Sequence, residues 1–539
     1  MNATQPGLRQ SAIVSTAIVA AGYLASRVLG LVRDIIILNT FGTGPLMDAY
    51  RAAFTVPDLI YLGVAGGALG TAFIPIFAEF LGADDQTAAW QLATAVAKLA
   101  FAGLALTSAA IALFAEPLVR LVFGGFTPQY QAVTVDLMRL MLLQPILLGI
   151  GGLAKATLES FDLFLLPAIG SNLYNIGIIA GALLLAPRLG IVGLVYGVLC
   201  GALLFVLVQL PGLRRVGARF ASADVAVWRV PGVGRVLRLL GPRIFGQSIW
   251  QINITAIAAF AASAGTGAVA ASAAALQLML LPHGLIALSL GTVLFPHLSR
   301  LFAAGEVGRL RSIFADAVGQ IVFLTLPAAL LLGLLATPVL RLLFQRGAFD
   351  AHSVALTSMA LATYAVGLAA FAAAEIVVRT SYAMQDTRTP VLVGVAAVLI
   401  NILLAALLVR PLGIAGLGLA FSIANIAECG ILLLLLRRRL GGLAPNFARS
   451  LAGMAIAGGF MAGAIVSFEA ISAPWLPFVR AGDTYRWPTD AIPLALWLLL
   501  VAAVSFGIYL AVAAALGLPN VRLLLGRLRA VMGRIGTRA

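Results

Sequence analysis

The stretch ASRVLGLVRDIIILNTFGTGPLMDAYRAAFTVPDLIY, residues 25–61, places six charged side chains in a segment otherwise apolar enough for a membrane. They are three arginines and three aspartates: Arg27, Arg33, Arg51, Asp34, Asp48 and Asp58. A charge at the centre of a membrane helix costs about 2.5–3.5 kcal/mol on insertion scales, so six would cost on the order of 15–20 kcal/mol. Such charges are retained where they pair or face a hydrated cavity. We therefore expect the first two helices to line a polar pathway.

The composition of the whole chain is that of a membrane protein. Its 539 residues are 62% hydrophobic and only 10% charged, and the mean hydropathy is +1.06. Apolar runs of about 20 residues, enough to cross a hydrocarbon core roughly 30 Å thick, recur from end to end. A transmembrane barrel would show short alternating segments instead. The sequence thus predicts an all-α polytopic membrane protein.

The apolar runs predict about fourteen transmembrane helices, with ends accurate to a few residues. Their ranges are 11–39, 45–78, 88–114, 132–158, 163–186, 191–211, 244–264, 268–299, 312–335, 353–378, 389–409, 412–436, 450–468 and 490–517. Of the 35 Lys and Arg residues, 23 fall in one alternate set of connecting segments and seven in the other. Basic residues favour the cytoplasmic side, so we expect both termini in the cytoplasm. The net charge of +15 could suggest a protein that binds nucleic acid, but this distribution of the basic residues argues against it.

Three pairs of segments indicate an internal repeat. LGTAFIP at 69–75 returns as LGTVLFP at 290–296, and LFAEPLVRLVFGG at 113–125 returns as LLATPVLRLLFQRG at 334–347. RLGIVGL at 188–194 returns as PLGIAGL at 411–417. Six spans in each copy would point both copies the same way across the membrane, as in transporters with parallel repeats.

This repeat predicts a domain organisation of two lobes and an addition. The N-terminal lobe would cover 1–220 with helices 1–6, and the C-terminal lobe 221–440 with helices 7–12. Residues 441–539 would add two helices, 13 and 14, and a basic cytoplasmic tail. A substrate path between the two lobes follows from this plan.

The charged pair of helices allows two interpretations. Three positive and three negative side chains sum to zero, which favours mutual pairing that only holds two helices together. The density of charge and the repeat favour a hydrated cavity that handles a charged substrate. Residues 244–299 of the second copy contain no Asp, Glu, Lys or Arg. The predicted path is therefore charged on one lobe and merely polar on the other.

Other functional chemistry is sparse. Glu375 and Glu428 lie within later spans and are candidates for a coupling-ion or proton site, with a structural hydrogen-bonding role as the alternative. Two cysteines and three scattered histidines offer no metal cluster. We find no phosphate-binding loop or nucleophile motif, which predicts a transporter of secondary type rather than an enzyme or an ATP-driven pump.

Four segments give the chain a family resemblance. SRVLGLVRD (26–34), FGTGPLMDAY (41–50), LGTVLFPHLS (290–299) and QDTRTP (385–390) resemble the MurJ (MviN) family of lipid II flippases. This family belongs to the multidrug/oligosaccharidyl-lipid/polysaccharide exporter superfamily. The resemblance covers nearly the whole chain, including the two extra C-terminal spans.

The resemblance implies two six-helix lobes around a central cationic cavity, with the extra helix pair forming a groove for an undecaprenyl tail. It implies lipid II, the undecaprenyl-diphosphate-linked glycopeptide precursor of peptidoglycan, as the substrate in a bacterial cytoplasmic membrane. The matching family positions are Ser26, Arg27, Arg33, Asp34 and Asp48. The chain departs from the family at Tyr61, Gln277 and Leu280, where the family usually carries charges. These departures put the anionic head group in question.

We therefore expect a flippase that works by alternating access in the bilayer. Ser26, Arg27, Arg33 and Arg51 would bind the substrate, and Asp34, Asp48 and Asp58 would pair with the arginines or take part in gating. Arg51 would compensate for the missing charges. No cofactor is expected, and energy would come from the membrane potential or a sodium or proton gradient. The alternatives are another lipid-linked oligosaccharide, an ion-coupled drug antiporter, and a non-transporting scaffold for cell-wall synthesis proteins.

Overall fold

The computed structural model describes residues 6–64, 68–219, 226–476, 479 and 484–521, and the side chains of 6–21, 23, 24, 63, 64, 68, 242 and 245 are not described. Every regular element within these residues is a helix, which confirms the predicted all-α class. The chain divides into two compact units, Met1–Val269 (unit 1) and Ala270–Ala539 (unit 2), which are treated separately below. The predicted basic tail at 522–539 lies outside the described residues.

Unit 1 contains α1 to α12. Their bounds are α1 Pro6–Phe41, α2 Pro45–Val64, α3 Ala68–Gly82, α4 Gln86–Leu113, α5 Ala115–Val122, α6 Pro128–Met141, α7 Leu143–Ser160, α8 Leu165–Ala180, η1 Gly181–Leu185, α9 Ala186–Leu189, α10 Ile191–Leu207, α11 Leu210–Arg215, η2 Val227–Arg229 and α12 Val233–Ser263.

Unit 2 contains the remaining helices, the first of which begins at the end of unit 1. Their bounds are α13 Ala268–Pro282, η3 His283–Leu288, α14 Ser289–Ala303, α15 Val307–Leu334, α16 Ala336–Phe344, α17 Ala351–Val366, α18 Leu368–Ala383, α19 Arg388–Leu412, α20 Ile414–Arg439, α21 Phe447–Ser472 and α22 Ala491–Ala515.

The helices have the length and composition of membrane spans. Among the described residues, ten helical segments are long and apolar enough to cross a bilayer, and the number rises to twelve if each of two bent helix pairs is one span. One pair is α17 and α18, which meet at Gly367 with a bend of 45°. The chain is therefore a multi-pass membrane protein, while the count of fourteen and the repeat stay predictions.

Close helix packing in unit 1 depends on glycines of α8, η1 and α10. A Cβ placed at Gly177 would lie 2.4 Å from Cα of Gly201. One turn further along, a Cβ at Gly181 would lie 2.5 Å from Cα of Gly197. Small residues let helix backbones approach closely, which is a main source of helix association in membranes. This pairing fixes α8, whose polar side chains face α1.

A second core of unit 1 joins α3, α4, α7 and α12. Phe77 of α3 packs edge-on against Trp90 of α4 and stacks on Phe73, with ring centroids 5.7 Å and 4.9 Å apart. Val233 and Val236 of α12 are buried in the same cluster. Unit 1 therefore continues past residue 220 because α12 packs on its other helices, whereas the predicted lobe boundary at 220/221 stays a prediction.

In unit 2, the QDTRTP segment forms the turn between α18 and α19. Gln385 adopts a positive φ of 62°, and the Asp386 carboxylate accepts a hydrogen bond from the backbone N–H of Thr389 at 3.1 Å. Asp386 also forms an ion pair with Arg439 at the end of α20. Burial raises the pKa of Asp386, but the Thr389 and Arg439 contacts outweigh it and hold this pKa below its ordinary value.

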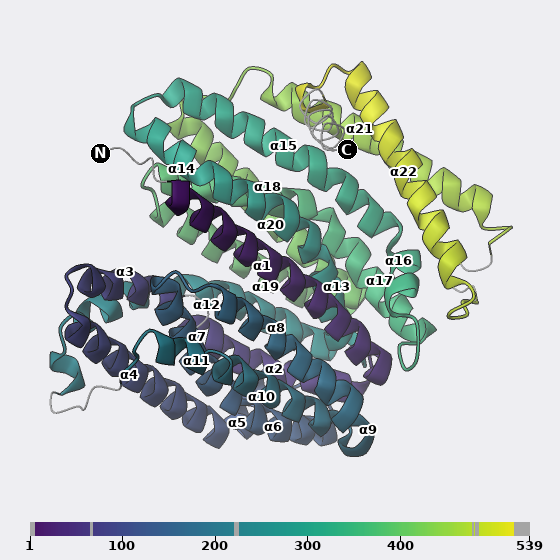
Figure 1. Ribbon diagram of the computed structural model, residues 1–539. Helices are drawn as coiled ribbons and strands as arrows, with labels where there is room; N and C mark the ends of the chain where they lie inside the picture. The colour runs from purple at the N-terminus through teal and green to yellow at the C-terminus, as the bar shows by residue number, and fades with distance from the viewer. Residues whose placement is uncertain (1–5, 65–67, 220–225, 477–478, 480–483, 522–539) are drawn as a thin grey trace. The chain divides into compact units, whose positions relative to one another are not determined.

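The last two described helices pack on α15 within unit 2 (Figure 1). Tyr509 of α22 is fully buried and donates a hydrogen bond to the carbonyl oxygen of Phe323 at 3.1 Å. Met454 and Met461 of α21 belong to the same buried cluster. This contact anchors the C-terminal pair of helices to the rest of unit 2.

Candidate functional site

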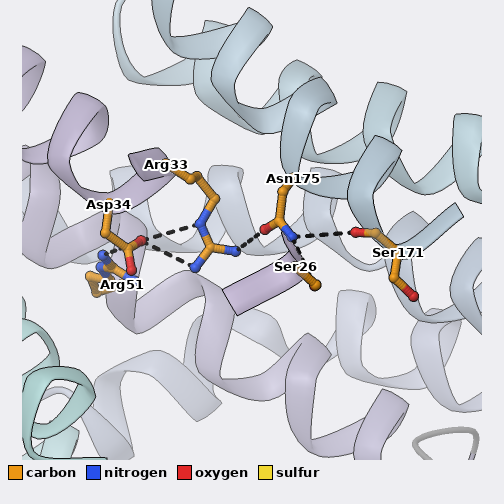
Figure 2. A network of polar contacts seen from close by, with 6 residues as sticks. All are labelled: Ser26, Arg33, Asp34, Arg51, Ser171 and Asn175. Atoms are coloured by element: carbon orange, nitrogen blue, oxygen red, sulfur yellow. Dashed lines mark hydrogen bonds and ion pairs between the residues drawn. The ribbon is translucent and has the colours of Figure 1, made fainter. Parts of the chain in front are cut away.

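Two arginines from two helices converge on one aspartate in unit 1. Arg33 and Asp34 are neighbours on α1, and Arg51 lies on α2 (Figure 2). The Arg33 Nε and Nη2 atoms lie 3.2 Å and 3.1 Å from Asp34 Oδ1. The Arg51 Nη2 atom lies 3.6 Å from the same oxygen. We call Arg33, Asp34 and Arg51 the charged centre.

Counted over its own three residues, the charged centre carries one more positive than negative charge, and Asp58 is the next acid that interacts electrostatically with both arginines. Two guanidinium groups share one carboxylate, and the exposed side-chain fractions are 21% for Arg33, 6% for Asp34 and 18% for Arg51. Among the described residues, Asp34 Oδ2 and Arg51 Nε and Nη2 are buried without a hydrogen-bond partner. Since guanidinium groups bind phosphate and carboxylate well, the centre has the charge and donors to hold an anionic group.

A polar residue of α8 holds Arg33 in place from the other side. The Asn175 side-chain oxygen accepts a hydrogen bond from Arg33 Nη1 at 3.0 Å, as Figure 2 shows. The Asn175 amide donates in turn to Ser26 Oγ at 3.4 Å and to the Ser171 carbonyl oxygen at 3.3 Å. Asn175 is buried, so it fixes the direction in which the Arg33 guanidinium points.

The third aspartate of this region, Asp58, is hydrogen-bonded to a neutral side chain and interacts electrostatically with Arg33 and Arg51. The Gln144 amide of α7 lies 3.5 Å from Asp58 Oδ1 and donates a hydrogen bond to the Tyr174 hydroxyl at 3.1 Å. Gln144 thus joins α2, α7 and α8. Tyr61, at a position where the resemblance implies an arginine, packs in the apolar cluster that includes Tyr174 and Phe205.

Asp48 stands at the opposite end of α2, in its first turn. Its carboxylate accepts a hydrogen bond of 2.5 Å from the backbone N–H of Gly267, which joins the α1–α2 turn to the segment between α12 and α13. Gly267 has a φ of +85°, and a Cβ there would lie 2.1 Å from the Thr43 carbonyl oxygen, so only glycine fits. Asp48 therefore joins two turns, as a residue that takes part in gating would.

The predicted substrate residues thus divide into two groups. Ser26, Arg33 and Arg51 belong to the network around Asp34, whereas Arg27 is exposed and has no ion pair within the described residues. The arginines of the charged centre share one ion-paired acid, and the two interpretations, mutual pairing and a cavity for a charged substrate, both stay predictions. The contacts within the described residues do not test whether any of these side chains binds the substrate, so that role stays a prediction.

The two glutamates predicted for ion coupling lie in unit 2 in different surroundings. Glu375 of α18 accepts a hydrogen bond from Arg379 Nε at 2.6 Å, and Arg379 Nη1 donates to Thr292 Oγ1 at 3.3 Å. Glu428 of α20 has no hydrogen bond or ion pair among the described residues. Its Oε1 would lie 3.7 Å from a Cβ placed at Gly394 of α19. No direct bond joins the two glutamates.

The hydrogen bonds and ion pairs described above do not involve the remaining two positions at which the chain departs from the family. Gln277 and Leu280 belong to α13 and are partly buried. Within the described part of the chain, no three His, Cys, Asp or Glu side chains could hold a metal ion together.

The sequence reasoning missed Asn175 and Gln144, which hold Arg33 and Asp58. A signal existed for Asn175, since Ser171, Asn172 and Asn175 recur at helical spacing in an apolar span and therefore share one face. Gln144 is a single polar residue in an apolar run, and its spacing gives no comparable signal.

Comparisons with known proteins agree on one family. The family model described as "Lipid II flippase MurJ" matches residues 37–481. "Lipid II flippase MurJ" of Burkholderia cenocepacia is 32% identical over 492 residues, which cover 90% of this chain and 94% of that protein. "Probable lipid II flippase MurJ" of Rhizobium tropici is 30% identical over 503 residues, covering 90% and 92%.

Solved structures share the fold at lower sequence identity. "Lipid II flippase MurJ, inward closed conformation" aligns with a TM-score of 0.75 and 22% identity over 92% of this chain and 98% of that one. An inward-facing multidrug resistance MATE family transporter of the MOP superfamily aligns with a TM-score of 0.66 and 16% identity, covering 77% and 94%. With the family model and the curated relatives, these matches confirm the resemblance: the chain belongs to the MurJ family.

Proposed function

We propose that this protein is a flippase that moves lipid II across the cytoplasmic membrane of a bacterium. The observation that carries the proposal is the charged centre, in which two arginines share one aspartate inside an apolar helical unit. Two arginines beside one ion-paired acid are costly in that environment, which favours their retention for an anionic ligand. The family supplies the ligand class, because its curated relatives are named lipid II flippases.

The contacts of the charged centre suggest a division of labour between the arginines. Arg33 is held by Asp34 and Asn175 and offers a fixed donor surface. Within the described residues, the ion pair of Arg51 is the longer 3.6 Å contact with Asp34, which leaves its guanidinium able to turn toward the substrate. The diphosphate or a carboxylate of the head group would compete with Asp34 for Arg51, while the prenyl tail stays in lipid. Weak, exchangeable contacts suit a site that must also release its cargo.

The gating and energy coupling are further parts of the proposal. The Asp48–Gly267 hydrogen bond would form and break between the two conformations of an alternating-access cycle. The membrane potential or a sodium or proton gradient would supply energy, with Glu375 and Glu428 as candidate sites for the coupled ion and no bound cofactor. The protein would act as a transporter rather than an enzyme, with both termini in the cytoplasm and cell-wall synthesis proteins as partners.

Another cargo on the same fold is the second candidate. Tyr61, Gln277 and Leu280 are uncharged where the resemblance implies charges, and the fold is shared with multidrug transporters. These features favour a different lipid-linked oligosaccharide or an ion-coupled drug antiporter. A non-transporting scaffold is the remaining candidate, and it predicts that substitutions of the charged residues in 27–58 leave function intact.

Complementation tests the proposal. The chain and its Arg27→Ala variant are expressed in a bacterium whose own lipid II flippase can be switched off, with Lys98→Ala as a control for loss of an exposed charge in α4. Rescue by the parent and by Lys98→Ala, without rescue by Arg27→Ala at equal membrane abundance, supports lipid II transport. Rescue by all three would contradict the role of Arg27. Failure of a well-expressed parent, joined to absent lipid II binding by the purified protein, would shift the proposal to another cargo.

A further inference from the structure

A small open pocket lies beside the charged centre, between α1, α7 and α8 of unit 1. Its volume is about 80 Å³, and its lining includes Gly22, Ser26, Lys155, Glu159, Phe164 and Ser171. A single water needs about 10–15 Å³ in this measure, so the pocket has room for a group of several atoms. α1 and α8 approach closely here, since a Cβ at Gly22 would lie 2.7 Å from the Ala168 Cβ.

The pocket contains one cation with a weak partner. Lys155 Nζ lies 3.8 Å from Glu159 Oε1, one helical turn away on α7, and the exposed side-chain fractions are 33% and 27%. The atoms are too far apart for a hydrogen bond. An ion pair of this kind contributes little to stability, so an anion that enters the pocket can replace Glu159 on the ammonium group.

The remaining wall adds hydrogen-bonding groups. Ser26 Oγ accepts a weak hydrogen bond from Asn175 at 3.4 Å and donates none within the described residues, so its hydrogen can bind an anion. Ser171 lines the pocket but donates its hydroxyl hydrogen to the Pro167 carbonyl oxygen at 3.2 Å. A hydroxyl donor and an ammonium group in one pocket are the groups that bind phosphate or carboxylate oxygens.

The pocket connects directly to the charged centre. Ser26 bonds to Asn175, which bonds to Arg33, so one buried amide links the two sites (Figure 2). Ser26 and Arg33 are seven residues apart on α1, a rise of about 10 Å along the helix. A head group bound at Ser26 would therefore need to move about that distance along α1 to reach Arg33.

We propose that Lys155 and Ser26 form a loading subsite for the anionic head group, where a phosphate or carboxylate displaces Glu159 before moving to the charged centre. This inference rests on the proposed function, since the occupant is part of the same lipid-linked substrate. Lys155 binds the anion, and Glu159 competes with it. The two neighbours therefore have opposite effects on affinity, which a purely structural ion pair would not produce.

The test measures binding and transport with the full-length protein in phosphatidylcholine nanodiscs and liposomes. The probes are lipid II, phosphatidylglycerol and inorganic pyrophosphate. The variants are Lys155→Gln, Lys155→Arg and Glu159→Gln, with Lys98→Gln as the matched control for loss of a lysine. Thermal unfolding of each variant checks that the protein stays folded.

We expect Lys155→Gln to weaken lipid II binding about fivefold, the effect of one charge that is about one-third exposed, and Glu159→Gln to tighten it by a similar factor. Lys155→Arg and Lys98→Gln should bind as the parent does. In transport, Lys155→Gln should raise the lipid II concentration for half-maximal rate and leave the maximal rate unchanged, because the charged centre is intact.

Three results would overturn the subsite. Unchanged lipid II binding by Lys155→Gln would show that Lys155 does not bind the head group. Equal losses of lipid II affinity in Lys155→Gln and Glu159→Gln would show that the two residues form a purely structural ion pair. Equal competition by phosphatidylglycerol or pyrophosphate would show a site for any anionic lipid or free phosphate. A parent protein that neither binds nor moves lipid II would instead refute the proposed function, and the subsite with it.

Discussion

Replacing Asp34 with asparagine tests whether the charged centre is a coupled unit. The substitution keeps the shape of the side chain but leaves Arg33 and Arg51 facing each other without a carboxylate. Breaking a buried ion pair by removing one partner costs about 3–5 kcal/mol. Because each arginine is about one-fifth exposed, we expect Asp34→Asn to cost about 3 kcal/mol in the free energy of unfolding, the lower end of that range.

The second arm of this prediction removes Arg51. Arg51→Gln alone should cost only about 1 kcal/mol, since its contact with Asp34 is long and Arg33 still neutralises the acid. In the double variant the repulsion between the two guanidinium groups is gone. We therefore expect it to be more stable than the sum of the single costs implies, by about 1–2 kcal/mol, as for residues that share a partner.

The measurement is an unfolding titration of the purified full-length protein in mixed micelles, followed by tryptophan fluorescence, for the parent, both single variants and the double variant. Asp136→Asn, at an exposed aspartate of α6, controls for the loss of a carboxylate elsewhere and should be neutral. Additive costs in the double variant would refute the coupling. An Asp34→Asn protein as stable as the parent would refute the ion pairs themselves.

Three further predictions follow from contacts elsewhere in the chain. Asn175→Ala should cost about 1.5–3 kcal/mol in unfolding free energy, because Arg33 loses a charge-assisted hydrogen bond. The control is Asn172→Ala, since the Asn172 amide donates to Ala168 within its own helix at 3.0 Å. Equal costs in the two variants would contradict the role of Asn175 in holding Arg33. Gly177→Leu should abolish folded protein because its Cβ would meet Gly201, whereas Gly82→Ala should be tolerated because a Cβ at Gly82 would meet open space. The abundance of each variant in the membrane fraction is the measurement that decides between these outcomes. Asp386 has a lowered pKa, so its contacts stabilise the fold above the unfolded-state pKa of about 3.9 and are lost as pH falls through the lower folded value. Asp386→Asn should therefore be less stable than the parent at pH 7, by a margin that shrinks as the pH is lowered below about 3.9, and a difference independent of pH would contradict the assignment.

Much of the fold could be predicted because hydropathy acts locally. Each predicted span overlaps helix in the structure, and the apolar runs alone give the class of the protein. Breaks within spans were harder to predict. The bend at Gly367 depends on a hydrogen bond from its N–H to Ser422 Oγ at 2.9 Å, and those residues are 55 positions apart in the chain.

The candidate site could be predicted in its members but not in its pairings. The charges of 27–58 stand out against an apolar background, so Arg33, Asp34 and Arg51 were recognisable. Their partners depend on how distant helices pack, because Arg33 bonds to a residue 142 positions away and Asp48 to one 219 positions away. Equal numbers of acids and bases suggested neutrality, whereas the structure gives one acid to two arginines at the charged centre.

Lipid II transport by Arg51 variants tests the central claim most directly. Fluorescently labelled lipid II is reconstituted with the parent, Arg51→Gln or Arg51→Lys in liposomes under an imposed membrane potential, and its movement between leaflets is timed. Arg51→Gln leaves Arg33 and Asp34 as a neutral pair, so we predict that it folds but moves lipid II at least about tenfold more slowly, a barrier increase of about 1.4 kcal/mol. Arg51→Lys keeps the charge and should retain most of the rate. Movement by Arg51→Gln at the parent's rate would contradict the claim that the excess positive charge handles the substrate.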